Sequence, residues 1–125
     1  MRLLLDTQIF IWLMNGDPRL SKSVLSRISH AEHVAISAAT IWEIAIKVRL
    51  GKLQLDVDEA IAEIGANGFE ELAVLSSHAR LVAKLPLLHG DPIDRLLVAQ
   101  AQAEQMRLLT ADPQLEPYTD LVVLV

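Results

Sequence analysis

Short apolar runs alternate with helix-like segments along the whole chain, and this alternation restricts the possible fold more than any other feature. Apolar runs typical of buried strands cover residues 2–5, 34–36, 107–110 and 121–124, and a weaker run covers 71–75. Between them lie segments with helix capping residues, at 7–14, 21–31, 38–50, 56–67, 76–84 and 91–106. Strands that alternate with helices usually pair in parallel, so the sequence predicts an α/β fold in which helices cover a parallel sheet.

The composition is that of a compact protein with a well-formed core. The 125 residues favour a single domain spanning 1–125, and the chain is 52% apolar with a mean hydropathy of +0.35. No apolar run approaches the roughly 18 residues of a membrane-spanning helix, and Asp6 interrupts the first run too early for a signal peptide. The absence of cysteine excludes thiolate metal sites and suits a cytoplasmic protein.

Four acidic residues lie beside residues that should be buried. Asp6 and Asp112 follow predicted strands, Asp94 lies in the first turn of a helix, and Glu43 lies further along another. Ligand sites of parallel sheets lie beyond the carboxyl ends of the strands, so the four carboxylates can meet in one pocket. Two carboxylates about 4 Å apart repel by roughly 4 kcal/mol at an effective dielectric near 20. Such a cluster calls for hard divalent ions, and an acidic pocket holding Mg²⁺ or Mn²⁺ can cut phosphodiesters.

Each acid also has a structural interpretation. Glu43 resists it best, because its helix is apolar nearly all round and should be buried, so that the carboxylate needs a partner. Lys47, one turn later, is one candidate partner, and a metal ion is the other. Asp6 can be explained as a helix cap. Asp94 can be explained as a first-turn acid favoured by the helix dipole, and Asp112 as a turn residue.

Three further residues lie near the predicted pocket. Lys47 and Arg95 could contact phosphates of a nucleic acid. His89 precedes Asp94 closely enough to shape the pocket, but its spacing from the other histidines does not indicate a metal ligand.

The first helix is apolar over more than a full turn. One face can pack on the sheet, whereas the other must be covered by a neighbouring helix or by a partner protein. We favour a partner interface, formed by Ile9, Phe10, Trp12 and Leu13.

Four motifs span nearly the whole chain: LLLDT at 3–7, ISAATIWEI at 36–44, HGDPIDRLLVAQA at 89–101 and LTAD at 109–112. In this order, and in a chain of this length, they resemble the PIN-domain nucleases, specifically the VapC-type toxins of bacterial and archaeal toxin–antitoxin pairs. The resemblance implies a three-layer α/β/α sandwich with a short central, mainly parallel sheet. It also implies a homodimeric endoribonuclease that cuts RNA and is inhibited by a cognate antitoxin.

The same resemblance assigns the site residues. It implies that four acids hold one or two Mg²⁺ or Mn²⁺ ions, namely Asp6, Glu43, Asp94 and Asp112. It places other residues close to the site, namely Thr7, Ser37, Thr110 and Asp91, of which Asp91 fits a structural role better. The net charge of −5 suits an RNA substrate poorly, although bound divalent ions would offset part of it.

Two alternatives differ in class. A phosphoacceptor receiver domain has a similar size, but it uses paired acids after the first strand, whereas Thr7 and Gln8 follow Asp6 here. A binding module without catalysis would use the acids structurally and dock a partner on the first helix. The complete set of four acids argues against that module, and a test for Mn²⁺ binding distinguishes the two.

Overall fold

Five short strands form one parallel sheet in the computed structural model, which describes residues 1–125. In spatial order the sheet is β3-β2-β1-β4-β5, and all four pairings are parallel. The strands are β1 (Arg2–Leu5), β2 (His33–Ser37), β3 (Glu70–Leu72), β4 (Arg107–Thr110) and β5 (Val122–Leu124). The predicted parallel sheet is therefore confirmed, with every expected strand present.

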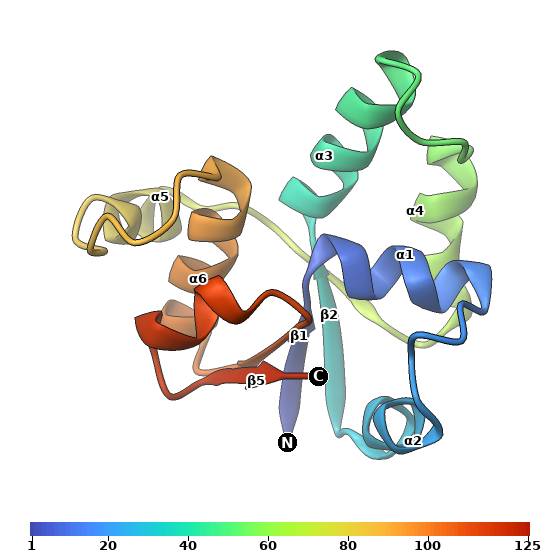
Figure 1. The fold of residues 1–125 in the computed structure, drawn as a ribbon, viewed down its shortest axis with the longest axis horizontal. Coiled ribbons are helices and arrows are strands. Elements are labelled where there is room, and N and C mark those ends of the chain that lie inside the picture. Colours follow the sequence, from blue (N-terminus) through green and yellow to red (C-terminus); the bar gives the residue numbers. More distant parts are fainter.

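Helices lie on both sides of the sheet and connect its strands (Figure 1). On one side lie α1 (Thr7–Asn15), α2 (Lys22–His30) and α4 (Val57–Ala66), and on the other lie α5 (Ser76–Val82), α6 (Pro92–Glu104) and the 3-10 helix η1 (Pro113–Tyr118). The remaining helix, α3 (Ala38–Arg49), follows β2 and extends away from the sheet. The predicted three-layer α/β/α sandwich is confirmed.

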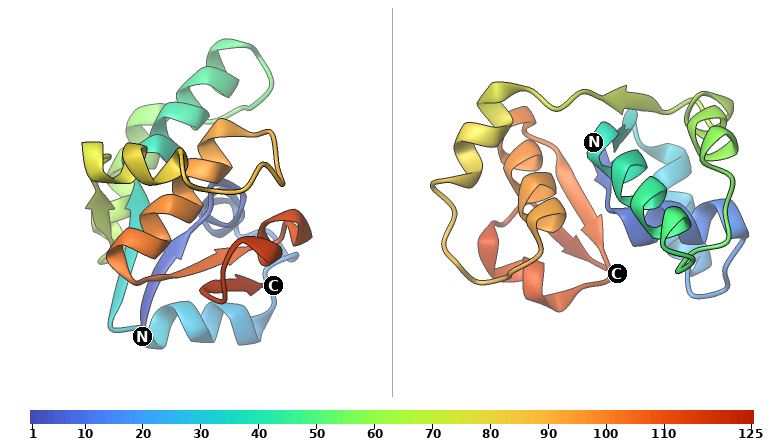
Figure 2. Two further views of the ribbon diagram at one scale, coloured as in Figure 1. Left: turned by 90° about the vertical axis from the view of Figure 1, so that its left-hand side faces the viewer. Right: turned by 90° about the horizontal axis from the view of Figure 1, so that it is seen from above.

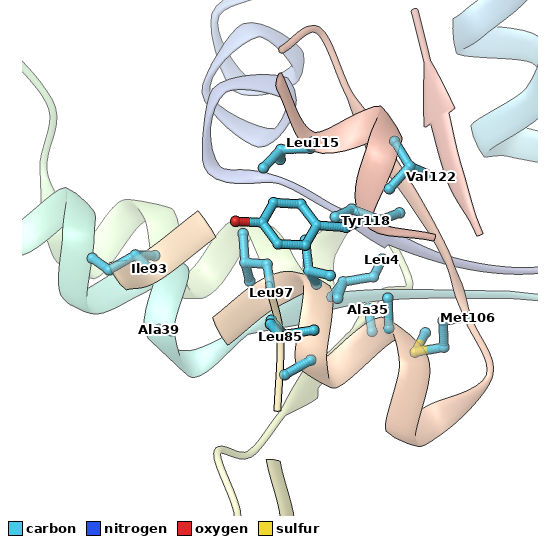
Figure 3. Packing of buried hydrophobic residues seen from close by; sticks show 14 residues of the cluster. Leu4, Ala35, Ala39, Leu85, Ile93, Leu97, Met106, Leu115, Tyr118 and Val122 are labelled. Carbon is cyan, nitrogen blue, oxygen red and sulfur yellow. The ribbon is translucent and has the colours of Figure 1, made fainter. Parts of the chain in front are cut away.

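Alternating side chains of the central strand supply both halves of the core. Leu4 packs with the α5, α6 and η1 side, whereas Leu3 and Leu5 pack with the α1, α2 and α4 side. All three leucines are fully buried, and burial of each contributes roughly 1.5–3 kcal/mol. Figure 3 shows the half of the core on the α5, α6 and η1 side, in which the Tyr118 ring lies over Leu97. Burial on both faces explains why β1 is apolar without alternation.

Neighbouring strands are parallel, so their carboxyl ends lie along one edge of the twisted sheet. In Figure 1 and in the left view of Figure 2, α2 lies near the amino end of β1, whereas α3 lies beyond the opposite end of the sheet. The carboxyl ends of β1, β2 and β4 therefore open toward the start of α1 and α3, which is where the acids lie.

No helix is long and apolar enough to span a membrane.

The prediction that the apolar helix 38–50 is buried is wrong for its outer face. Trp42 is 61% exposed and Leu50 is 62% exposed, and Ile46 is also exposed. The cause is the direction of α3, which leaves the sheet, so that only one side of the helix packs against α1, α4 and α6. Apolar composition therefore does not report burial here.

The segment 76–84 begins with two serines, and the sequence predicts that one of them caps its helix; this prediction is wrong. Neither Ser76 nor Ser77 caps α5; Leu75 takes the cap position, and its N–H donates to Nδ1 of His78 at 3.1 Å. The His78 ring is fully buried and its Nε2 lies 2.9 Å from Glu104 on α6. The ring therefore satisfies the backbone N–H of Leu75, the residue just before α5.

Candidate active site

Asp6 follows β1 directly, and its backbone N–H donates to Leu109 of β4 at 3.0 Å. Its side chain caps α1 by accepting from the Ile9 N–H at 2.8 Å, and it also accepts a hydrogen bond from the hydroxyl of Thr110. The residue is only 5% exposed. Asp6 is therefore both a helix cap and a buried carboxylate at the carboxyl end of the sheet.

Hydroxyl groups fix the elements around this carboxylate. Ser37 is buried at the end of β2 and caps α3, accepting from the Ala39 N–H at 3.1 Å. Thr7 donates to Thr40 at 3.2 Å, which ties the first turn of α1 to the first turn of α3. These contacts set the direction in which α3 leaves the sheet. That direction brings the next turn of α3, with Glu43, over the site.

Glu43 has one oxygen paired and one oxygen free. Its Oε2 lies 3.0 Å from Nζ of Lys47, and its side chain is only 13% exposed. Its Oε1 is buried and has no hydrogen-bond partner. Lys47 and a metal ion can therefore both be partners of Glu43, because the lysine contacts only Oε2 and leaves Oε1 free for the ion.

The start of α6 and the end of β4 supply the remaining acids. Asp91 caps α6 by accepting from the N–H groups of Ile93 and Asp94, at 2.9 and 3.0 Å. The cap places Asp94 in the first helical turn. Asp112 follows β4, and its N–H donates to Thr110 at 3.0 Å.

A cavity of about 370 Å³ joins these elements. Five carboxylates line this cavity, and Lys47 and Trp12 line it as well. The carboxylates are Asp6, Glu43, Asp91, Asp94 and Asp112. The structure thus brings together all four acids singled out in the sequence, and adds Asp91 beside them.

Burial and the charges of neighbouring carboxylates raise the pKa of two of these carboxyl groups. Burial raises the pKa of Asp6 from 3.8 to about 6, as do the charges of Glu43 and Asp112, against the opposing hydrogen bonds from Thr110 and Ile9. Asp94 behaves similarly. Burial and the charges of Asp91, Asp6 and Glu43 raise its pKa to about 6, against the hydrogen bond from His89. Without a cation, the pocket carries more negative charge than it can easily hold.

The residues fit a hard divalent cation. Carboxylate oxygens are the ligands that Mg²⁺ and Mn²⁺ take most readily, and the free, buried Oε1 of Glu43 is an acceptor without a donor. A buried acceptor without a partner is costly unless a ligand completes it. The donor set and this free oxygen point to the same kind of occupant.

Without metal, the Asp6 carboxylate should destabilise the fold as pH rises. Between its unfolded pKa of 3.8 and its folded pKa of about 6 the folded state binds more protons, so the free energy of unfolding falls with rising pH. The shift corresponds to roughly 2–3 kcal/mol. We expect the free energy of unfolding of Asp6→Asn to exceed that of the wild type by this amount at pH 7 in EDTA, and to approach it below pH 3.8, as measured by urea unfolding. An equal difference at both pH values would contradict the assignment.

Arg95 does not face the pocket, so its predicted contact with RNA is wrong. The side chain is 9% exposed and donates to the backbone oxygens of Pro86 and Val82, at 2.8 and 3.2 Å, and to the Tyr118 hydroxyl at 3.1 Å. Successive helical residues do not face the same way, and Arg95 therefore points away from Asp94. It holds the chain segment before α6.

The predicted partner interface on the first helix is wrong for Ile9 and Phe10. Both are fully buried in the core because α1 packs this face on the sheet. Trp12 and Leu13 are half-buried instead, and they line a separate groove of about 350 Å³ with residues 16–18, 20–22 and 25. The buried indole Nε1 of Trp12 has no hydrogen-bond partner.

Sequence reasoning gave His89 no role as a ligand, yet its Nε2 lies 3.1 Å from Asp94 and 3.4 Å from Asp112. No spacing among the histidines could have indicated this, because His89 approaches acids rather than another histidine. Its closeness to Asp91 and Asp94 in the sequence was the available signal.

Comparisons with known proteins show the family of the chain. The family model described as "PIN domain" matches residues 3–120. Ribonuclease VapC22 of Mycobacterium tuberculosis is 29% identical over 117 residues, which cover 92% of this chain and 90% of that protein.

Solved structures share the fold at lower identity. The VapBC2 complex of Rickettsia felis, bound to a promoter DNA fragment, aligns with a TM-score of 0.74 at 18% identity, covering 100% of this chain and 98% of the other. A toxin–antitoxin complex from Klebsiella pneumoniae aligns with a TM-score of 0.69 at 22% identity, covering 97% and 95%. The family model extends over nearly all of the sequence, and the chain belongs to the PIN-domain family.

Proposed function

We propose that this protein is a metal-dependent endoribonuclease and acts as the toxin of a toxin–antitoxin pair. The observation that carries the proposal is the cavity at the carboxyl end of the sheet, in which five carboxylates meet and one buried oxygen of Glu43 has no partner. Family membership and the similarity to a protein named as a ribonuclease support the same activity.

Four acids hold one or two Mg²⁺ or Mn²⁺ ions in this proposal: Asp6, Glu43, Asp94 and Asp112. A bound divalent ion offsets the charge of the scissile phosphate and acidifies a water molecule. Asp91 serves chiefly to cap α6, and Thr110 orients the Asp6 carboxylate through its hydrogen bond. Lys47 stands at the cavity wall with 41% of its side chain exposed, where it can meet a phosphate of the RNA.

Two surfaces are available for the protein partners. The groove beside Trp12 and Leu13 is predominantly apolar and adjoins the acidic cavity through Trp12, which lines both. We assign this groove to an antitoxin, since a segment seated there would also reach the cavity. The exposed apolar face of α3, with Trp42 and Ile46, is the candidate surface for a second copy of the chain.

Incubation of the purified protein with total cellular RNA and Mn²⁺ tests the proposed activity. We expect a small number of discrete fragments that disappear when EDTA is added, and mapping their ends identifies the target RNA. Intact RNA together with the absence of Mn²⁺ binding in calorimetry would refute the nuclease and favour the binding module.

A further inference from the structure

His89 contacts two of the acids that line the cavity, although it is not one of the acids on which the proposed function depends. Its Nε2 lies 3.1 Å from Oδ2 of Asp94 and 3.4 Å from Oδ2 of Asp112. One ligand atom from each of these three residues lies within 4.8 Å of the other two. The His89 side chain is only 18% exposed, so the ring faces the acids rather than solvent.

The separations between these atoms match those between ligands of one metal ion. For an octahedral ion with bonds of about 2.1 Å, adjacent ligand atoms lie about 3 Å apart. The two distances from the His89 nitrogen, 3.1 and 3.4 Å, are close to this value. The imidazole and the two carboxylates can therefore bind one ion together without a large rearrangement.

Contacts outside the cavity fix the segment that carries His89. The His89 N–H donates to the hydroxyl of Tyr118 at 2.8 Å, and Arg95 donates to the same hydroxyl at 3.1 Å. Arg95 also donates to Pro86 at 2.8 Å. The Tyr118 ring is anchored in the core, and Figure 3 shows its hydroxyl directed toward the Ile93 end of the cluster. The backbone of His89 is thus held by Tyr118, while its ring contacts the acids.

We propose that His89 is a ligand of the divalent ion that Asp94 and Asp112 hold, and that its nitrogen makes the site prefer Mn²⁺ to Mg²⁺. The inference rests on the proposed function, because it adds a ligand to the same metal site. An imidazole nitrogen suits first-row transition metals, whereas an all-oxygen set suits Mg²⁺. The chain's preference between the two ions then depends on a single side chain.

Electron spin-echo spectroscopy of the Mn²⁺-loaded protein tests the proposal directly. We expect modulation from a directly bound ¹⁴N nucleus in the wild type, and its loss in His89→Gln. Calorimetry should show that His89→Gln weakens Mn²⁺ binding by roughly 10-fold or more, with a smaller loss for Mg²⁺. The matched control is His33→Gln, which changes an exposed histidine at the start of β2, at the end of the sheet away from the cavity.

The outcomes separate this inference from the proposed function. Mn²⁺ binding and Mn²⁺-dependent RNA cleavage without any ¹⁴N coupling would overturn the role of His89 and leave the nuclease standing. An unchanged ratio of Mn²⁺ to Mg²⁺ affinity in His89→Gln would also overturn it. The absence of Mn²⁺ binding in the wild type would overturn both.

Discussion

Asp6→Asn should lower the rate of RNA cleavage by at least about 10³-fold while the protein stays folded. A metal ligand set contributes several kcal/mol of transition-state stabilisation, and about 4 kcal/mol corresponds to 10³-fold in rate. Asparagine has nearly the same shape as aspartate. Its Oδ1 can still accept from the Ile9 N–H, and its Nδ2 can donate to the Thr110 hydroxyl, so the two contacts of Asp6 are conserved in form.

The control for this substitution is Asp56→Asn. Asp56 caps α4 and accepts from the N–H groups of Asp58 and Glu59, but it is exposed and lies outside the cavity. Single-turnover cleavage of a labelled target RNA in Mn²⁺ measures both variants. We expect Asp56→Asn to retain wild-type activity, and full activity of Asp6→Asn would remove Asp6 from the site.

Arg95→Met should lower the free energy of unfolding by about 3–4 kcal/mol. Methionine retains an unbranched apolar stem but removes the donors to Pro86, Val82 and Tyr118. Each largely buried acceptor left without a donor costs about 1–3 kcal/mol, and the segment before α6 loses its anchor.

Urea unfolding measures this loss, with Arg107→Met as the control. Arg107 begins β4 and is exposed, so the same change of side chain should alter stability by less than about 0.5 kcal/mol. Equal stabilities of the two variants would show that the buried guanidinium does not hold the fold together.

The parallel sheet could be predicted from local signals alone. The central strand β1 is a short run of apolar residues that ends at Leu5, before the capping residue Asp6, and parallel pairing follows from the helices between strands. The convergence of the acids follows from the same topology. A chain that places Asp6 one residue and Asp112 two residues after neighbouring parallel strands has to bring them to the same edge.

The features of the structure that the sequence did not predict depend on contacts between residues that are distant in the sequence. Trp42 is exposed because α3 leaves the sheet, and no periodicity in 38–50 records whether a neighbour lies alongside. Arg95 turns inward to carbonyl groups about ten residues earlier in the chain. His89 reaches the acids because Tyr118, 29 positions later, holds its backbone. Local sequence patterns therefore do not show the exposure of Trp42, the direction of Arg95 or the contact between His89 and Tyr118.

Anomalous diffraction from crystals of the protein grown with Mn²⁺ shows whether the four acids form a metal site. We expect at least one strong Mn²⁺ peak in the cavity bounded by Asp6, Glu43, Asp94 and Asp112, within bonding distance of their carboxylate oxygens. The same peak should be absent or much weaker in crystals of Asp6→Asn. A cavity without any peak in Mn²⁺-saturated crystals would contradict the claim that these acids form a metal site.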